Sequence, residues 1–344
     1  MKQLYILLML VLITLTTSKA SNNKFEKYWD KIFLSNEKPV VSDTMYVMVT
    51  TRCFFPNSKI VFNDKVDIEN KPKVVLVVCN KLKWNLHIMK DLDEAMSFLP
   101  QKKDLVTYVE GVGKTFPLAL FRSAGLTTQY NINVIMFDYP SLKESFSLAK
   151  GYYYSIKNIQ KANKYFFDFL SKMQSYKQSS AKWIANKNNI LFVHSMGNRL
   201  LKETIINNTI SNLDTNLFNH LVINAPCVKQ KEHSKWVNSI QFARNIFIIY
   251  NKRDKRLKSA LLLSPKMLLG LKVHKPFASK AIYIDMKNVL NGMHNGFIYN
   301  PYMGTIPSKS KEFYTWIFNG NLAEKLESTA FEKLAFERFY RLKN

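Results

Sequence analysis

Cysteine and glycine are scarce in this sequence of 344 residues. Three cysteines (Cys53, Cys79 and Cys227) are too few for a disulfide framework, and none lies in a C-x-x-C pair of the kind that binds zinc. Only 10 glycines are present, and no Pro/Gly/Ser linker is long enough to divide the chain. The sequence also lacks any run of about 18 or more apolar residues, which excludes a multi-pass membrane protein.

Acidic residues are half as numerous as basic ones: 25 Asp and Glu face 50 Lys and Arg, for a formal net charge of +25. Such a charge first suggests a nucleic acid or another anionic partner. The lysines are scattered, however, and no arginine-rich stripe or basic helix with interleaved aromatics is present, so nucleic-acid binding is not favoured. Hydrophobic residues make up 47% of the chain, which excludes wholesale disorder.

The N-terminus has the pattern of a secretory signal peptide. A charged start at Lys2 precedes an apolar run from Leu4 to Leu15, and small residues at Ser18 and Ala20 fit a cleavage site. The alternative is an uncleaved anchor or a buried helix. We expect cleavage after Ala20, export to the periplasm or medium, and a mature chain (21–344) without a membrane span.

Short apolar, β-branched runs alternate with helical patterns along the mature chain, which predicts a single α/β domain with a mostly parallel central sheet flanked by helices. The segment 255–279 is too long for a tight turn, and its apolar triplets suggest an insertion or lid with its own helix. The predicted strands are Met45–Thr50, Val74–Cys79, Leu105–Val109, Ile132–Phe137, Ile190–Val193, Leu221–Asn224, Ile246–Tyr250 and Ala281–Ile284. The predicted helices are Leu92–Leu99, Phe116–Leu126, Ile156–Met173, Gly197–Ile206 and Ala323–Phe339.

The most specific motif is a serine between a strand and a helix. The apolar run 190–193 leads directly into His194-Ser195-Met196-Gly197, and a helical pattern follows. This is the context of a nucleophile elbow, in which a strained turn presents the serine hydroxyl at a helix N-terminus. The alternative is a serine that merely caps a helix. The usual G-x-S-x-G motif has a small residue two positions before the serine, where this chain has Val193.

A serine nucleophile needs a histidine base and an acid that orients it, in the chain order Ser, acid, His for this kind of turn. Asp254 follows the strand 246–250, and His294 lies in a glycine-flanked loop after the strand 281–284. Asp285 is a rival acid, but it ends the strand that leads to His294. Asp138 also follows a strand, but it precedes the serine. Four further histidines could be the base, but none lies in a glycine-flanked loop after the last predicted strand: His87, His220, His233 and His274.

The oxyanion hole should combine the backbone N–H of Met196 with one from the loop after the strand 105–109. Gly111 would let that loop approach the reacting oxygen, and Val112 would supply the second N–H. The same loop contains Gly113-Lys114-Thr115, which is like the end of a phosphate-binding loop. The first glycine of that motif is replaced by Tyr108, so nucleotide binding is not favoured.

The combination of motifs resembles a bacterial alpha/beta-hydrolase family of unknown function. The family's motifs have counterparts here in Val49-Thr50-Thr51-Arg52, Glu110-Gly111-Val112-Gly113, Phe137-Asp138-Tyr139-Pro140-Ser141, Val193-His194-Ser195-Met196-Gly197-Asn198 and Ala225-Pro226-Cys227. The resemblance spans roughly residues 45–304. It implies an alpha/beta-hydrolase fold and a triad of Ser195, Asp254 and His294, with no substrate class assigned.

Three residues depart from that family pattern. Glu110 replaces a histidine before the oxyanion glycine, and a carboxylate there is unfavourable unless it points away from the developing charge. Val193 crowds the turn. Cys227 replaces an aspartate that could have served as an alternative acid, which strengthens Asp254.

We therefore expect an exported serine hydrolase that acts on a small-molecule or lipid acyl ester, or a thioester, and that needs no metal or organic cofactor. The alternative is an inactive hydrolase-fold protein that binds an anionic glycan or lipid. Neither the substrate nor the oligomeric state can be predicted from the sequence.

Overall fold

The computed structural model describes residues 29–81, 83–143, 146–208, 210–299, 305–321 and 330–343. The predicted signal peptide, residues 1–20, lies outside the described residues. Within these ranges, no helix has the length and apolar character needed to cross a membrane.

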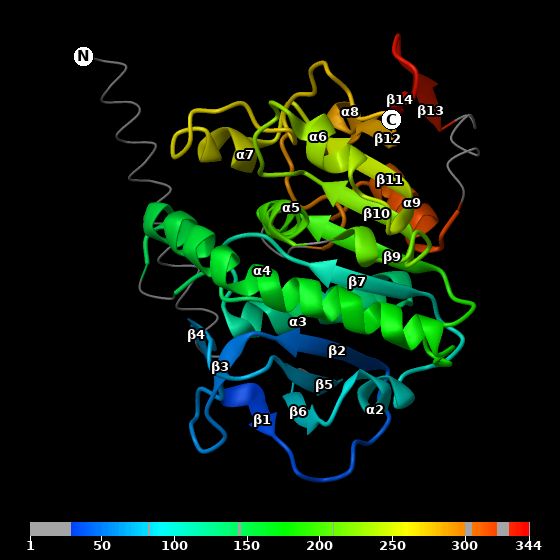
Figure 1. Cartoon of the computed structure of the whole chain (residues 1–344). Helices are drawn as coiled ribbons and strands as arrows, with labels where there is room; N and C mark the ends of the chain where they lie inside the picture. Colours follow the sequence, from blue (N-terminus) through cyan, green and yellow to red (C-terminus); the bar gives the residue numbers. More distant parts are fainter. Residues whose placement is uncertain are drawn as a thin grey trace.

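A central sheet of twelve strands in the described residues runs through the molecule in the order β1-β6-β5-β2-β8-β7-β9-β10-β11-β12-β14-β13 (Figure 1). Its middle, from β2 through β8 to β12, is parallel, and the β2–β5, β5–β6 and β13–β14 pairs are antiparallel. A separate two-stranded sheet joins β3 and β4. The strands are β1 Ile32–Leu34, β2 Thr44–Thr50, β3 Arg52–Phe54, β4 Phe62–Val66, β5 Lys73–Asn80, β6 Lys83–Met89, β7 Leu105–Val109, β8 Asn133–Asp138, β9 Asn189–His194, β10 Phe218–Asn224, β11 Ala243–Tyr250, β12 Ala281–Asp285, β13 Phe331–Lys333 and β14 Phe339–Leu342.

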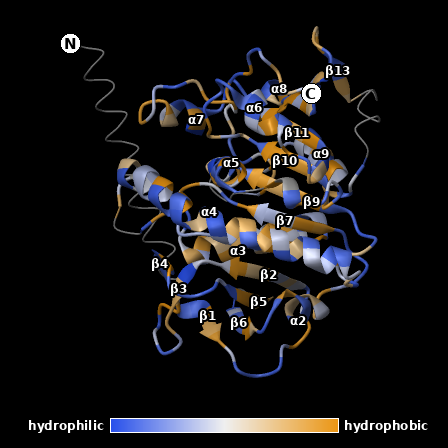
Figure 2. Ribbon diagram, in the orientation of Figure 1, coloured by the Kyte–Doolittle hydropathy of each residue, from blue (hydrophilic) through white to orange (hydrophobic). Residues whose placement is uncertain are grey.

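Helices cover both faces of the sheet, and each face has its own hydrophobic core. One core packs under α2, α4, α5, α6 and α7, and the other under α3, α8 and α9. The central strands β7 and β9 are buried on both faces, which favours apolar side chains along a strand. The hydropathy colouring shows much of β10 and β11 as hydrophobic (Figure 2). The helices are α2 Leu92–Ser97, α3 Phe116–Tyr130, α4 Leu148–Gln178, α5 Gly197–Asn207, α6 His233–Asn238, α7 Lys255–Ala260, α8 Lys287–Leu290 and α9 Ser308–Phe318, with 3-10 turns η1 Trp29–Lys31 and η2 Ile210–Asn212.

All eight predicted strands are present, with ends shifted by at most a few residues, and β7 has the predicted bounds. Six strands of the described residues were not predicted: β1, β3, β4, β6, β13 and β14. These strands are short or carry polar and exposed side chains, as in the partly exposed β6 near one edge of the sheet. Their sequences therefore lack the continuous apolar run that identified the buried strands.

The prediction of a C-terminal helix over Ala323–Phe339 is wrong from residue 331 onward. Residues 322–329 lie outside the described residues, but β13 and β14 replace the helix after them. β14 pairs in parallel with β12, where Phe339 stacks on Tyr283 with ring centroids 4.3 Å apart. Apolar residues of this segment, such as Phe339, are instead buried in the short strand β14. Helix α9, just before, was not predicted.

The segment 255–279 begins with its own helix, α7, but the apolar triplets that suggested a helix lie beyond it in turns. Leu268, Leu269 and Leu271 from this segment are buried in the core on the α4–α5 face. The segment is thus anchored at its C-terminal half, whereas Leu262 and Met267 remain exposed.

Candidate active site

Ser195 occupies the sharp turn between β9 and α5. Its φ is 52°, in the left-handed region that is costly for a residue with a side chain. The turn is held from both sides, because Ser195 N–H donates to the Asn224 carbonyl at 2.9 Å and the Ser195 carbonyl accepts from Cys227 N–H at 3.0 Å. The predicted strand–turn–helix context around Ser195 is therefore present, and the backbone strain is balanced by bonds to β10 and the loop after it.

Two residues of α5 explain why the turn can be so tight. The Asn198 side-chain amide donates to the carbonyls of Val193, Ser195 and Asn224 at 3.0, 3.2 and 3.1 Å. A Cβ at Gly197 would lie 2.8 Å from the Glu110 carbonyl, so only glycine allows α5 to approach β7 this closely. Gly197 is part of the motif visible in the sequence, whereas the hydrogen bonds of the Asn198 amide had no signal there.

Asp254 and His294 are brought together from the loops that follow β11 and β12. His294 Nδ1 lies 2.6 Å from Asp254 Oδ2, and both side chains are largely buried. The other oxygen, Asp254 Oδ1, accepts from Leu257 N–H at 2.9 Å and caps α7. The Asn251 side chain also donates to the carbonyls of Asn291 and Met293, which fastens the two loops together. The Asp254 carboxylate is thus held in place by its bond to Leu257 N–H, and it holds the imidazole of His294 at Nδ1.

Ser195 follows the end of β9, and Asp254 and His294 lie in the loops after β11 and β12, so all three lie on the side of the sheet where these parallel strands end (Figure 1). The ring of His194, the residue before the serine, lies against the ring of His294 with centroids 4.6 Å apart. Within the described residues, the Ser195 hydroxyl makes no hydrogen bond, so no bond to His294 is present. In proteins without substrate, the bond between nucleophile and base is often long and tightens only when substrate binds.

Gly111 lies directly beside the serine. A Cβ at this position would be 2.7 Å from Ser195 Cβ and 3.1 Å from both Met196 N and Ser195 Oγ. The Gly111 N–H is already used, since it donates to Glu110 Oε1 at 2.7 Å. Among the described residues, the N–H groups of Met196 and Val112 have no acceptor. These two groups, rather than the N–H of Gly111, are available to hold an oxyanion.

The Glu110 carboxylate is held within a buried charged cluster. Oε2 accepts from Tyr108 Oη at 2.5 Å and from Arg122 Nε at 2.8 Å. Burial opposes ionisation of Glu110, but the positive charges of Lys114 and Arg122 outweigh it and hold the pKa of this carboxyl well below its usual range. The negative charge that the sequence analysis found unfavourable is therefore compensated by Arg122, which also stacks on Phe297.

The family described as "Alpha/beta hydrolase of unknown function (DUF900)" matches residues 89–279, more than half of the chain. The chain belongs to this family. No curated protein and no solved structure matches the chain. The matched range contains the Glu110–Gly113 loop, the elbow and Asp254, and it ends before His294.

In this alpha/beta hydrolase, a chain of hydrogen bonds runs beneath the site through His194. Tyr314 Oη donates to Asn224 Oδ1 at 2.7 Å, Asn224 Nδ2 lies 2.9 Å from His194 Nδ1, and His194 Nε2 lies 3.0 Å from Asn295 Oδ1. These partners assign the proton of a neutral His194 to Nε2. Burial holds the pKa of His194 well below its usual value, against the attraction of Glu110. His194 is thus a buried residue of the turn, and its partners Asn224, Asn295 and Tyr314 had no signal in the sequence.

The two rival acids, Asp285 and Asp138, have other partners in the structure. Asp285 pairs with Arg341 at 3.2 Å, and Asp138 pairs with Arg52 at 2.8 Å. Arg52 is fully buried and also reaches Asp64 at 2.6 Å and the Lys114 carbonyl at 3.2 Å. Arg52, the last residue of the Val49-Thr50-Thr51-Arg52 motif, thus links β3, β4, the end of β8 and the loop that carries Val112.

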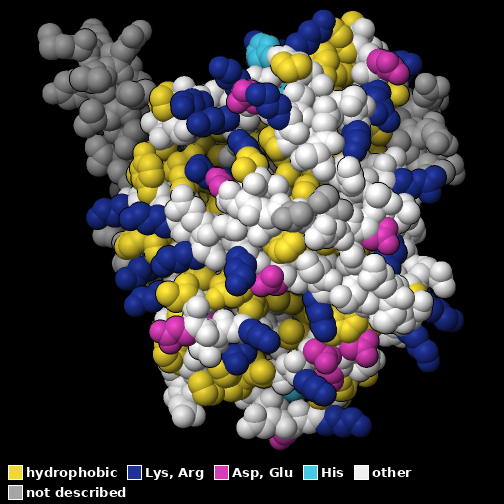
Figure 3. Space-filling model, viewed as in Figure 1, with side chains coloured by type: hydrophobic (Ala, Val, Ile, Leu, Met, Phe, Trp, Pro, Cys, Tyr) yellow, Lys and Arg dark blue, Asp and Glu magenta, His cyan; other side chains and the backbone are white. Residues whose placement is uncertain are grey.

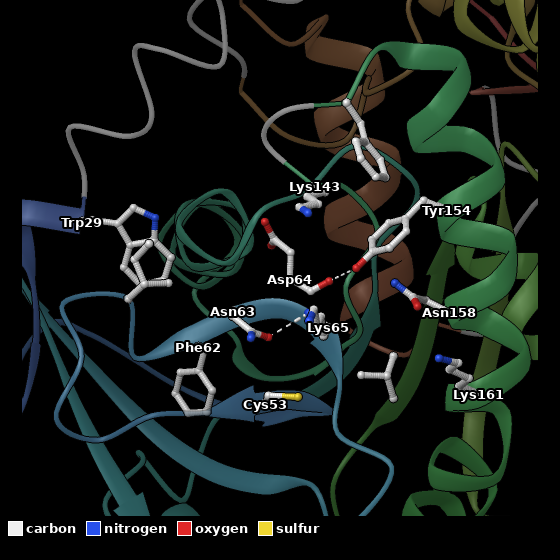
Figure 4. A pocket seen from close by; sticks show the side chains of 13 residues that line it. Trp29, Cys53, Phe62, Asn63, Asp64, Lys65, Lys143, Tyr154, Asn158 and Lys161 are labelled. Carbon is white, nitrogen blue, oxygen red and sulfur yellow. Dashed lines mark hydrogen bonds between the residues drawn. The ribbon is translucent and has the colours of Figure 1, made fainter.

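A cavity of about 480 Å³ lies beyond this ionic link, between the β3–β4 hairpin and α4. Figure 4 shows the Asp64 backbone accepting a hydrogen bond from Tyr154, with Asn158 and Lys161 farther along α4. Ser195, Asp254 and His294 do not line this cavity. Within the described residues, no group of His, Cys, Asp and Glu side chains is arranged to hold a metal ion.

Proposed function

We propose that this alpha/beta hydrolase is an exported serine hydrolase that cleaves carboxylic esters or thioesters through Ser195, His294 and Asp254. The observation that carries the proposal is the 2.6 Å pair of Asp254 and His294, at the sheet edge where the strained Ser195 also lies. Export rests on the sequence pattern of residues 1–20.

In the first half-reaction, Ser195 Oγ attacks the carbonyl carbon of the ester while His294 Nε2 accepts the hydroxyl proton. The carbonyl π electrons move onto oxygen, and the N–H groups of Met196 and Val112 stabilise that oxyanion. The carbonyl then reforms, the bond to the leaving oxygen or sulfur breaks, and His294 returns its proton to the leaving group. Asp254 keeps Nδ1 protonated and stabilises the imidazolium that forms in between.

In the second half-reaction, a water molecule attacks the acyl-enzyme carbonyl and gives a proton to His294. Collapse of the second oxyanion breaks the bond to Ser195 Oγ, which takes the proton back, and the carboxylic acid is released. The helix N-terminus at Gly197 favours the negative charge in both steps.

The proposal is tested by labelling the purified protein with a fluorophosphonate probe. We expect wild type to be labelled, Ser195→Ala to be unlabelled, and Asp254→Asn to be labelled much more slowly. Thermal unfolding of each variant checks that it is folded. A folded wild type that is not labelled would overturn the enzyme proposal and favour the alternative of a hydrolase-fold binding protein.

A further inference from the structure

Three lysines beside the elbow have no acidic partner. Lys202 lies on α5, Lys229 follows β10, and Lys266 lies in the segment 255–279. Within the described residues, none of the three forms an ion pair. The nearby carboxylates are already engaged, since Glu203 pairs with Arg199 at 3.7 Å and Glu232 with Lys235 at 2.8 Å. The local positive charge is therefore only partly offset, by Glu232, whose pKa the charge of Lys202 helps to lower.

Two of these lysines are held close together by the backbone. Lys229 forms an isolated antiparallel bridge with Leu268, and the neighbouring Gln230 N–H donates to the Met267 carbonyl at 2.8 Å. Repulsion by the positive charge of the nearby Lys266 lowers the pKa of Lys229. Like charges held together without a counter-ion are unfavourable, and an external anion would relieve that repulsion.

Exposed apolar side chains lie next to the same lysines. Tyr153 on α4 is 54% exposed, Leu262 is 62% exposed and Met267, adjacent to Lys266, is 44% exposed. Tyr153 Oη donates to the Leu263 carbonyl at 3.1 Å, which places α4 against the segment 255–279. Figure 3 shows Lys and Arg side chains around apolar ones on the side of the molecule where α7 and the start of α4 lie.

We infer that this surface docks on a membrane that carries anionic phospholipids; we call it the basic–apolar surface, and it consists of Tyr153, Lys202, Lys229, Leu262, Lys266 and Met267. The lysine ammonium groups would attract the lipid phosphates, and Leu262 and Met267 would enter the boundary between headgroups and acyl chains. Tyrosine is a residue that commonly lies at the headgroup level. Nucleic acids and anionic glycans would match the charge but would leave the apolar side chains in water.

Lys202 lies on α5, which begins directly after Ser195, and Leu262, Lys266 and Met267 lie in the segment that follows Asp254. The basic–apolar surface therefore adjoins the elements that carry the proposed site. The inference therefore deepens the proposed function: the ester would belong to a lipid and would be met at the bilayer surface. Binding to the membrane does not require ester cleavage, so an experiment can overturn the docking inference or the enzyme proposal without overturning the other.

The test is co-sedimentation with vesicles of phosphatidylcholine alone and with vesicles in which about a third of the lipid is phosphatidylglycerol. We expect binding to the anionic vesicles only, weakening several-fold between about 0.1 M and about 0.5 M NaCl. All variants are made in the mature chain, residues 21–344, so the apolar run of residues 4–15 is absent from each. The double variant Lys229→Gln/Lys266→Gln should bind about thirtyfold more weakly. Leu262→Asn should also bind more weakly.

The matched controls lie at the opposite edge of the sheet. Lys102→Gln/Lys103→Gln removes the same charge just before β7, and Val41→Asn removes an exposed apolar side chain just before β2. Both should bind as wild type does. Equal loss in the controls, unchanged binding of Lys229→Gln/Lys266→Gln, or binding to heparin or DNA in preference to the vesicles would each overturn the inference.

The Ser195→Ala variant separates this inference from the proposed function. It should bind vesicles as wild type does. Vesicle binding by a wild type that takes no fluorophosphonate label would overturn the enzyme proposal alone. A labelled wild type that does not bind the anionic vesicles would overturn the docking inference alone.

Discussion

Gly111 is the residue whose contacts most directly limit what the site can tolerate. Its missing side chain leaves the space into which Ser195 Cβ and Oγ fit, at 2.7 and 3.1 Å from the position a Cβ would take. We predict that Gly111→Ala will displace either the serine or the Val112 loop and slow fluorophosphonate labelling about a hundredfold, while the protein stays folded.

The control for Gly111→Ala is Gly151→Ala on α4. There a new methyl group would meet only the end of the Leu142 side chain, at 2.8 Å. This variant should be labelled at the wild-type rate. Equal rates for Gly111→Ala and wild type would contradict the assignment of this loop to the oxyanion hole.

His194 should make the fold sensitive to acid. Its pKa in the folded protein is well below the usual value, so below about pH 6.5 the unfolded chain takes up a proton that the folded chain does not accept. The free energy of unfolding should therefore fall by about 1 kcal/mol per pH unit from this residue as the pH drops below about 6.5.

Urea unfolding of wild type and His194→Gln at pH 7 and pH 5 measures this effect. The variant should be less stable than wild type at pH 7 but should lose less stability between the two pH values. The other buried histidines contribute equally to both proteins, so the difference between the slopes isolates His194. Parallel slopes would show that His194 is not held neutral.

At the level of elements, Arg52 connects the most parts of the structure. It joins β3, β4 and β8 and donates to the loop after β7, with its side chain fully buried. We predict that Arg52→Met will lower the free energy of unfolding by about 3–5 kcal/mol, because it leaves Asp138 buried without its cation.

Urea unfolding checks this prediction, with the exposed Arg244→Met as control, expected to stay within about 0.5 kcal/mol of wild type. Arg52→Lys should fall between the two, because an ammonium keeps the charge but cannot reach Asp138 with two nitrogens at once. A small effect of Arg52→Met would mean that the cluster is open to water.

The whole molecule should be stabilised by salt, because 50 basic residues face only 25 acidic ones. Repulsion between like charges destabilises the compact state, and salt screens it over about 10 Å at 0.1 M. We predict that the melting temperature rises by a few degrees between about 0.02 M and about 0.2 M NaCl. NaCl and KCl should act alike. A falling melting temperature would show that ion pairs such as Arg52–Asp138 outweigh the general repulsion.

The elements that could be predicted were those whose local pattern has one solution. The strands β7, β9 and β11 are continuous apolar runs between turn residues, and burial on both faces is the only arrangement that hides them from water. The edges of the sheet had no such signal, since β1, β6 and β14 depend on a neighbouring strand for their hydrogen bonds.

The sequence by itself determined the alpha/beta class, the strand–serine–helix turn and the chain order of Ser195, Asp254 and His294, because each depends on local periodicity or on spacing. Only the tertiary structure decided which side chains surround these three residues. The Asp254–His294 contact spans 40 residues, Glu110 meets Arg122 across a strand–helix connection, and Tyr314 reaches Asn224 over 90 residues. Such pairs have no periodicity to detect, because the packing of the helices on the sheet, rather than any local pattern, sets the distances between their atoms.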